Sequence, residues 1–324
     1  MLFIMMLLVS TLMSLSSNNW LGSWMGLEIN LIVFIPLIHT SLNYYSSESS
    51  MKYFIIQSMS SSLLLLGIIL MSLKFFDSLS YFIIMCGLMA KLGMAPFHMW
   101  LPSVMEGISW FNCMLLSTWQ KFAVLMLISY VVNNLYIFLP VILSLMIGSI
   151  GGLNQSSMKK LMSYSSINNM GWITMSMLSS MFIWMNYFII YSFMVLSLMI
   201  LFNNNGINYL NQCFLVSFSS LNKYFISSLM FSLGGLPPLL GFMPKWMVIQ
   251  SMIFSMNYFI VMLMILTSLL TLFYYIRISM KMILVNSIKF KWMQMNYCNQ
   301  ELTYFLCFSN LLGFILIIFL KSFY

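Results

Sequence analysis

Charged residues are scarce in this sequence. Only 6% of its 324 residues are charged and 62% are hydrophobic, so a soluble domain of this length could not cover its surface with polar side chains. No polar stretch is long enough to form an appended globular domain. We therefore interpret the chain as an integral membrane protein whose function lies within the membrane.

Catalytic and cofactor-binding motifs are also missing. The sequence has no Walker A, G-x-G-x-x-G or nucleophile motif, which argues against catalysis on nucleotides by this chain alone. Its five cysteines form no C-x-x-C pair, and two histidines are too few for the haems of an energy-transducing cytochrome b. We predict no disulfide framework, no metal and no cofactor on this chain. The cysteines are Cys86, Cys113, Cys213, Cys298 and Cys307.

Acidic residues are fewer than basic ones, at five against thirteen, which gives a net charge of +8. In a soluble protein this balance would suggest nucleic acid, but in a membrane protein it reports orientation, and we expect no nucleic-acid partner. The expected topology collects basic residues on one side of the membrane, namely Lys52, Lys159, Lys160, Lys223, Arg277, Lys281, Lys289 and Lys291. Only Lys74 and Lys321 fall on the other side. This asymmetry places the N-terminus, which we interpret as a mature helix rather than a signal peptide, on the positive side.

Long apolar segments are abundant. A helix needs about 20 apolar residues to cross a bilayer, and cutting the chain at polar and Gly/Pro/Asn-rich positions predicts about eleven transmembrane helices. We therefore expect an all-α polytopic membrane protein. The segments are 1–17, 20–42, 51–73, 79–107, 112–132, 135–153, 161–178, 182–202, 223–257, 258–284 and 302–320.

Two of these segments contain helix breakers. The fourth is interrupted near 91–102 by "KLGMAPF", and the ninth near 233–246 by "LGGLPPLLGFMPKW". Interrupted helices at corresponding places in two halves are typical of transporters built from inverted repeats. We predict antiporter-like inverted five-helix units at 1–133 and 134–285, followed at 286–324 by a basic loop and one extra helix.

Four charged residues fall towards the centre of predicted spans, where each costs at least about 2.5 to 3.5 kcal/mol. Glu28 lies mid-span, Lys91 precedes the first break, Lys121 lies in the fifth segment and Lys245 follows the second break. Burial disfavours a charged lysine whereas a nearby carboxylate favours it, so such a lysine can change charge with its neighbour. Broken backbone can also hold water that passes protons. We predict that these four residues carry protons.

Simpler interpretations remain open for each of them. Glu28 could hydrogen-bond within the bundle. Lys121 could extend its side chain towards the membrane surface, and Lys245 could lie near the membrane interface. His98, seven residues after Lys91, is either a proton relay or a structural partner of the broken backbone. His39 is expected at the membrane interface.

Several stretches resemble a known family. The chain is similar to the mitochondrially encoded subunit 2 family of NADH dehydrogenase, the antiporter-like membrane subunits of respiratory complex I. The matching stretches are "WMGLEINLIVFIP" (24–36), "KLGMAPFHMWLP" (91–102), "TWQK" (118–121), "GGLNQSSMKKLMSYSSINNMGW" (151–172) and "LGGLPPLLGFMPKW" (233–246). Beyond residue 255 the match is mainly in hydropathy.

The resemblance implies a core membrane-arm subunit of NADH:ubiquinone oxidoreductase in the mitochondrial inner membrane, with its N-terminus on the matrix side. Such a subunit contributes to proton translocation driven by electron transfer from NADH to ubiquinone. It belongs to an enzyme but carries no redox chemistry, because FMN, iron–sulfur clusters, NADH and ubiquinone bind other subunits. Its implied partners are the other membrane-arm subunits, neighbouring antiporter-like subunits among them, and lipids, with cardiolipin as a candidate.

The resemblance also assigns roles to single residues. Glu28 corresponds to the mid-membrane glutamate of the family and would pair with Lys91, while Lys121 and Lys245 would continue the hydrophilic axis. One departure is Ser103, where relatives often have an acid, although Glu106 follows three residues later. The rival hypotheses are a free-standing cation/proton antiporter and a passive structural spacer of the membrane arm.

Overall fold

The computed structural model describes residues 2–39, 43–73, 77–132, 134–215, 220–284 and 308–310. These residues form helices and connecting turns, with an isolated β-bridge between Ser157 and Tyr209 and no strand among them. The predicted all-α class is therefore confirmed. The expected basic loop lies outside the described residues, as does the C-terminal helix at 302–320 apart from 308–310. The same holds for Lys74, Lys289, Lys291, Lys321, Cys298 and Cys307.

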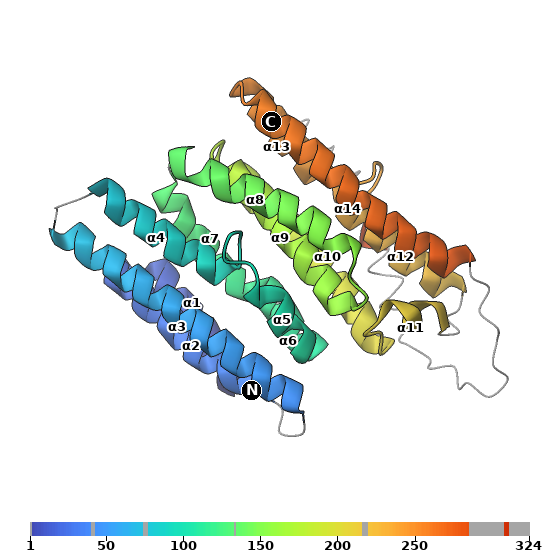
Figure 1. The fold of residues 1–324 in the computed structure, drawn as a ribbon, viewed down its shortest axis with the longest axis horizontal. Coiled ribbons are helices and arrows are strands. Elements are labelled where there is room, and N and C mark those ends of the chain that lie inside the picture. The colour runs from blue at the N-terminus through green and yellow to red at the C-terminus, as the bar shows by residue number, and fades with distance from the viewer. Residues whose placement is uncertain are drawn as a thin grey trace. The chain divides into compact units, whose positions relative to one another are not determined.

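The chain divides into two compact units, and unit 1 is Met1–Ser144. Its helices are α1 (Leu2–Ser16), α2 (Trp20–Ile38), α3 (Tyr44–Leu73), α4 (Asp77–Leu92), α5 (Trp100–Gly107), α6 (Trp110–Ser117), α7 (Trp119–Val131) and the first part of α8 (Asn134–Leu153). Helices α1, α2 and α3 lie side by side, and α3 also packs on α4 and α5 (Figure 1). Helix α7 packs on α4 and α1.

Unit 2 is Leu145–Tyr324 and contains the rest of α8. Its other helices are α9 (Met158–Met177), α10 (Met181–Asn204), α11 (Leu210–Leu215), α12 (Ser220–Gly234), α13 (Phe242–Phe254) and α14 (Tyr258–Leu284). Helix α10 packs on α9, α12 and α13, and α12 packs on α14. Most of α9 is buried, although many of its residues are serine or asparagine.

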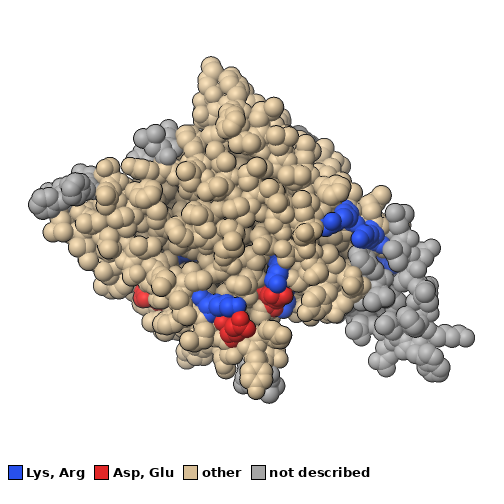
Figure 2. All heavy atoms as spheres, viewed as in Figure 1, with Lys and Arg blue, Asp and Glu red and all other residues tan. Residues whose placement is uncertain are grey.

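Six described helices are long and apolar enough to cross a membrane. They are Trp20–Ile38, Tyr44–Leu73, Trp110–Val131, Tyr136–Leu153, Met181–Asn204 and Tyr258–Ile283. Helix α9 is not among them because its buried polar side chains lower its hydropathy. Charged side chains are sparse on the face drawn in Figure 2, as a membrane-embedded surface requires. The predicted count of eleven helices stays a prediction.

The two predicted breaks have the same backbone design. Helix α4 ends immediately before Gly93, whose φ is 71°, and α12 ends immediately before Gly235, whose φ is 86°. In each case the glycine N–H bonds back three residues, and the following N–H bonds back five, to Met89 in the first break and to Phe231 in the second. This is the Schellman arrangement, which favours glycine because a side chain is strained at positive φ. The chain resumes as helix at Trp100 and at Phe242.

A third interruption was not predicted from the sequence. The fifth expected segment, 112–132, divides at Thr118 into α6 and α7. The Thr118 hydroxyl donates to the carbonyl of Met114 at 2.7 Å, and such bonds to the preceding turn bend helices. Lys121 lies three residues further on and donates its backbone N–H to the Thr118 carbonyl. Each of the three buried lysines is therefore close to a helix interruption.

Candidate functional site

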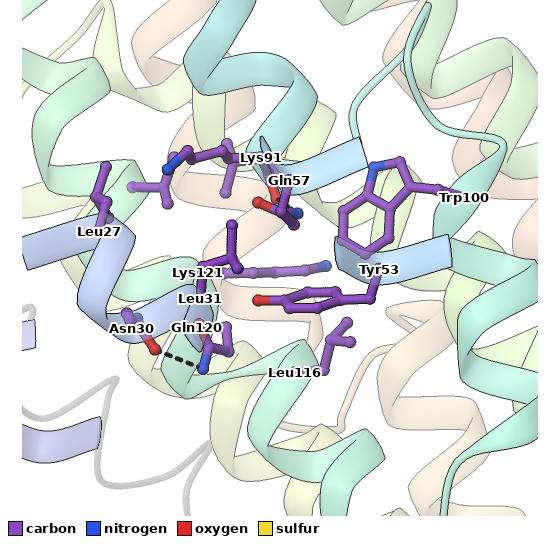
Figure 3. Close-up of a pocket in the computed structure, with 12 residues that line it drawn as sticks. Leu27, Asn30, Leu31, Tyr53, Gln57, Lys91, Trp100, Leu116, Gln120 and Lys121 are labelled. Carbon is purple, nitrogen blue, oxygen red and sulfur yellow. Dashed lines mark hydrogen bonds between the residues drawn. The ribbon is translucent and has the colours of Figure 1, made fainter. Parts of the chain in front are cut away.

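A small cavity in unit 1 brings together two of the predicted lysines. Lys91, from the end of α4, and Lys121, from the start of α7, line one cavity of about 20 Å³. In Figure 3 their side chains enter it from different helices, with Tyr53 and Gln57 of α3 beside them. A cavity needs about 10 to 15 Å³ of probe-occupied volume to hold one water molecule, so this one is large enough.

The polar side chains around the cavity are held by hydrogen bonds and ring contacts. Gln120 donates to the side chain of Asn30 at 2.8 Å, which ties α7 to α2. The ring of Tyr53 packs edge-on against Phe34, with centroids 5.3 Å apart, and against Trp100, with centroids 6.0 Å apart. The cavity wall therefore combines fixed amides and a phenol with the two lysines. The sequence did not predict these neutral polar residues, because three helices distant in the chain supply them.

Both lysines are deeply buried. Lys91 is 8% exposed and Lys121 is 3% exposed. The ammonium of Lys121 has no hydrogen-bond partner among the residues that the structure describes. An ammonium in that position is costly unless water or a partner compensates its charge.

Glu28 lies next to this site but does not line the cavity. It is half-buried on α2, and its Oε2 atom is buried without a described hydrogen-bond partner. No ion pair within 4.0 Å joins it to Lys91, so the pairing implied by the family resemblance is not formed in this structure. The carboxylate is still near enough to interact electrostatically with Lys91 and Tyr53.

Two carbonyls at the end of α4 accept hydrogen bonds from side chains of other segments. The indole N–H of Trp100 donates to Ala90 at 3.0 Å, and the amide of Gln57 donates to the carbonyl of Lys91 at 3.3 Å. His98 is buried, with its Nδ1 atom 3.3 Å from the carbonyl oxygen of Pro96, and does not line the cavity. The structure thus places His98 in the connection between α4 and α5. His39 is exposed at the end of α2.

We expect Trp100→Phe to lower the free energy of unfolding by about 1 to 3 kcal/mol, because it removes a buried donor and some packing volume. Thermal unfolding of the purified protein measures the change. Trp119→Phe is the matched control, since its indole N–H is buried without a described partner. Equal losses in the two variants would show that the bond to Ala90 contributes nothing.

Lys245 occupies a different environment, within unit 2. It is 6% exposed, so its side chain is buried among the residues of unit 2. Its ammonium donates to the carbonyl of Gly234 at 2.8 Å and to that of Leu233 at 3.4 Å. It also lies 5.8 Å from the centre of the Trp172 ring. Lys245 therefore binds the end of α12, where the helix dipole favours a positive charge.

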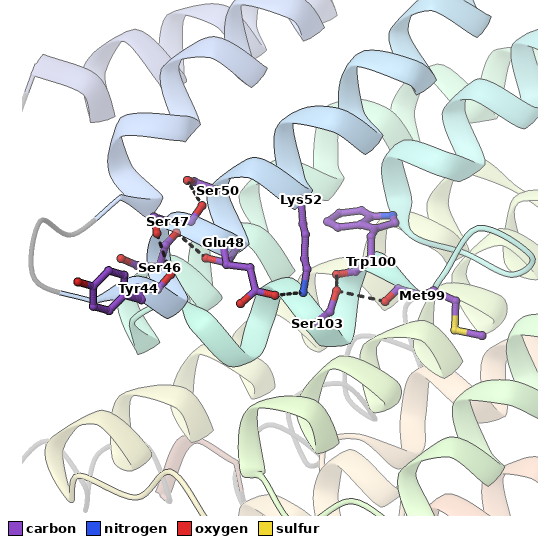
Figure 4. Close-up of polar contacts among 10 residues, drawn as sticks. Tyr44, Ser46, Ser47, Glu48, Ser50, Lys52, Met99, Trp100 and Ser103 are labelled. Carbon is purple, nitrogen blue, oxygen red and sulfur yellow. Dashed lines mark hydrogen bonds and ion pairs between the residues drawn. The ribbon is translucent and has the colours of Figure 1, made fainter.

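Three further charged residues, Glu48, Lys52 and Glu106, are at the surface. Figure 4 shows the exposed ion pair between Lys52 and Glu48, with a separation of 2.6 Å, near Ser103. The Ser103 hydroxyl donates to the carbonyl of Trp100 at 2.9 Å, so it serves its own helix. Glu106 is exposed on α5. No group of three or more His, Cys, Asp or Glu in the described part of the chain is placed to hold a metal ion.

Comparison with known proteins gives the family. Residues 17–75 and 73–271 match the family described as "NADH:quinone oxidoreductase/Mrp antiporter, TM". The NADH-ubiquinone oxidoreductase chain 2 of Anopheles gambiae is 45% identical over 312 residues, which are 93% of this chain and 91% of that protein. This chain belongs to the NADH-ubiquinone oxidoreductase chain 2 family. The chain 2 of Peropteryx kappleri is 39% identical over 90% of each chain.

Solved structures share the fold of this chain 2 family member. A chain of "Respiratory complex I from Thermus thermophilus with bound Aureothin" matches with a TM-score of 0.83 and 21% identity, over 96% of this chain and 77% of that chain. A chain of the Mrp complex from Dietzia sp. DQ12-45-1b matches with a TM-score of 0.77 and 15% identity, over 86% and 59% of the two chains. At these identities the likeness shows the antiporter-like fold.

Proposed function

We propose that this chain is a membrane-arm subunit of NADH-ubiquinone oxidoreductase and takes part in proton translocation coupled to electron transfer from NADH to ubiquinone. The names of its relatives and the antiporter-like fold support the assignment. The observation that carries the proton role is the water-sized cavity shared by Lys91 and Lys121, each beside a helix interruption.

Like charges in this cavity favour proton exchange between the two lysines. Two ammonium groups in one poorly hydrated cavity repel each other, so a proton that arrives on one lysine favours release from the other. One water molecule between them could accept and donate the transferred proton. The carboxylate of Glu28 stabilises a charge on Lys91, and its movement would change where the proton rests. The proposed sequence of carriers in unit 1 is therefore Glu28, Lys91 and Lys121, with His98 as a candidate relay.

Lys245 is the proposed carrier of unit 2. Its charged form donates to two carbonyls at the end of α12, and loss of its proton would weaken both bonds. Protonation of Lys245 is thus linked to the geometry of the second break. We also propose the repeat organisation, with inverted five-helix units at 1–133 and 134–285 and an addition at 286–324. The matching glycine turns at Gly93 and Gly235 support it.

The proposed location is the mitochondrial inner membrane with the N-terminus on the matrix side, which follows from the relatives and the charge asymmetry. The proposed partners are other subunits of the membrane arm, neighbouring antiporter-like subunits and lipids such as cardiolipin. FMN, iron–sulfur clusters, NADH and ubiquinone are assigned to other subunits of the complex.

The experiment compares Lys91→Met and Glu28→Gln in the complete complex reconstituted into liposomes. We expect fewer protons translocated per NADH oxidised in both variants, with the complex fully assembled. An unchanged ratio would contradict the roles of the two residues. Failure to assemble would support the rival hypothesis of a structural spacer, and cation/proton exchange by the purified chain alone would support a free-standing antiporter.

A further inference from the structure

Unit 2 contains a buried lysine but no acidic residue in its described part. Lys245 of α13 is 6% exposed, and a buried charge is normally paired. Four acidic residues of the chain belong to unit 1 and the fifth lies outside the described residues, namely Glu28, Glu48, Asp77, Glu106 and Glu301. Groups other than a carboxylate of its own unit therefore stabilise the charge of Lys245.

Backbone carbonyls and an aromatic ring surround the Lys245 ammonium. It donates to the carbonyls of Gly234 at 2.8 Å and Leu233 at 3.4 Å, both at the end of α12. It also lies over the ring of Trp172, 5.8 Å from the ring centre. The face of an aromatic ring attracts a cation within about 6 Å, most strongly for tryptophan and in places without water. Lys245 thus has carbonyls on the side of α12 and an aromatic face on the side of α9.

Trp172 presents this face from a tightly packed position. It is 0% exposed on α9, and α9 packs on both α13 and α10. Its indole N–H is buried and has no hydrogen-bond partner among the described residues. A buried indole N–H usually has such a partner. The contribution of this side chain to its polar surroundings is therefore the face of its ring.

The Lys245 side chain has little room on the side of the second break. A Cβ atom on Gly235 would lie 2.9 Å from its Cδ atom and 3.0 Å from its Nζ atom. The stem of the lysine therefore lies directly against the glycine turn. This close approach confines the ammonium between the end of α12 and the ring of Trp172.

The other ionisable side chains around α13 supply no negative charge. Helices α9, α10 and α14 pack on α13, and α12 supplies the carbonyls. Their buried titratable side chains are phenols, neutral below about pH 10, namely Tyr187, Tyr191, Tyr274 and Tyr275. Their charged side chains are all basic and lie towards helix starts and ends, namely Lys159, Lys160, Lys223, Arg277 and Lys281. The ring of Trp172 is thus the negative side-chain surface that unit 2 offers to Lys245.

In unit 1 a carboxylate occupies the comparable place. Glu28 lies on α2, the second helix of the first proposed unit, and interacts electrostatically with Lys91. Trp172 lies on α9, which is the second helix of the second proposed unit. The two units therefore place different charge-stabilising groups on corresponding helices, a carboxylate in the first and an aromatic face in the second.

We propose that Trp172 is the charge-stabilising partner of Lys245 and sets the pH range over which Lys245 keeps its proton. The inference rests on the proposed role of Lys245 as a proton carrier. Trp172 acts as a positioning residue, because its ring neither accepts nor donates the proton. Without the ring, the ammonium is less stable relative to the neutral amine, so Lys245 releases its proton at a lower pH.

The test measures protons translocated per NADH oxidised as a function of pH, for Trp172→Leu in the complete complex in liposomes. This ratio is insensitive to changes in the rate of NADH oxidation itself. We expect its decline at alkaline pH to move to lower pH by about one unit, which is a tenfold weaker binding of the proton or about 1.4 kcal/mol. Trp172→Phe keeps an aromatic face and should move the decline by about half as much.

Trp184→Leu is the matched control on α10. Trp184 is 1% exposed and its buried indole N–H also lacks a described partner, but no described lysine or arginine lies over its ring. Its loss should lower stability and leave the pH profile in place. The inference is overturned if Trp172→Leu lowers the ratio equally at every pH, as a packing defect would. If Trp172→Leu does not assemble, a Trp172→Phe profile that coincides with that of the unmodified complex overturns it.

Lys245→Met separates this inference from the proposed function. If this variant leaves the ratio unchanged, the carrier role of Lys245 fails and the role of Trp172 fails with it. If it lowers the ratio at every pH while Trp172→Leu behaves like Trp184→Leu, Lys245 remains a carrier and only the role of Trp172 fails. A lowered ratio in Lys245→Met together with a shifted profile in Trp172→Leu supports both.

Discussion

Lys121→Met should abolish coupled proton translocation while the protein becomes more resistant to unfolding. The Lys121 ammonium is 3% exposed and has no described hydrogen-bond partner, so its burial costs free energy that methionine would not. Methionine fills a similar volume and cannot bind a proton. We expect an increase of about 1 to 3 kcal/mol in the free energy of unfolding together with loss of pumping. Thermal unfolding and proton uptake by proteoliposomes measure the two effects.

Lys52→Met is the control for Lys121→Met. Lys52 is exposed on α3 and pairs with Glu48, and surface ion pairs contribute about 0 to 1 kcal/mol. We expect normal pumping and nearly unchanged stability in this variant. If Lys121→Met pumped normally, the shared cavity would be a packing feature. If Lys121→Met instead lowered the stability, the Lys121 ammonium would have a partner other than the described residues of unit 1.

The breaks could be predicted from the sequence because their cause is local. Gly93 and Gly235 each follow an apolar helix and precede prolines, and a left-handed residue after the last turn is a very common helix ending. Lys91, Lys121 and Lys245 could be singled out because charges within apolar segments are rare. All three are buried, as such residues require.

What the sequence did not predict depends on contacts between distant segments. The interruption at Thr118 is an exception to this: its hydroxyl bonds to the nearby carbonyl of Met114, but the hydroxyl of Thr174 makes the same bond to Met170 inside unbroken α9, so the residue type alone does not predict a break. Trp100 binds the end of α4 only because α5 turns back against it. The amide pair of Asn30 and Gln120 joins residues ninety positions apart, so local periodicity holds no signal for it.

The structure also changes how the two breaks compare. When the two breaks are aligned, Gly93 corresponds to Gly235 and Trp100 corresponds to Phe242. In this alignment the position of Lys245 corresponds to Ser103 and not to Lys91. Lys91 precedes its break and lines a cavity, whereas Lys245 follows its break and binds helix-end carbonyls. The two lysines therefore do different chemistry on similar backbones, and variants of one should not reproduce the effects of the other.

Gly241→Ala should have the largest effect on folding of any single substitution at the second break. A Cβ atom on Gly241 would overlap the backbone carbonyl oxygen of Ser232, and a backbone atom cannot rotate away as a side chain can. Either α13 must move away from α12 or the Schellman turn at Gly235 must open. We expect a loss of at least about 3 kcal/mol, the upper end for overpacking, and little assembled complex at the growth temperature.

Gly206→Ala separates this steric effect from the general cost of replacing glycine. Gly206 lies two residues after the end of α10 with a φ of 64°, and nothing lies within 4 Å of the position that its Cβ atom would occupy. Its replacement costs only the left-handed conformation, about 1 to 2 kcal/mol. Native electrophoresis of the assembled complex and its thermal inactivation compare the two variants. If both assembled equally well, the start of α13 would have room to shift, and the close approach of Gly241 to Ser232 would not be needed to hold Lys245 against the end of α12.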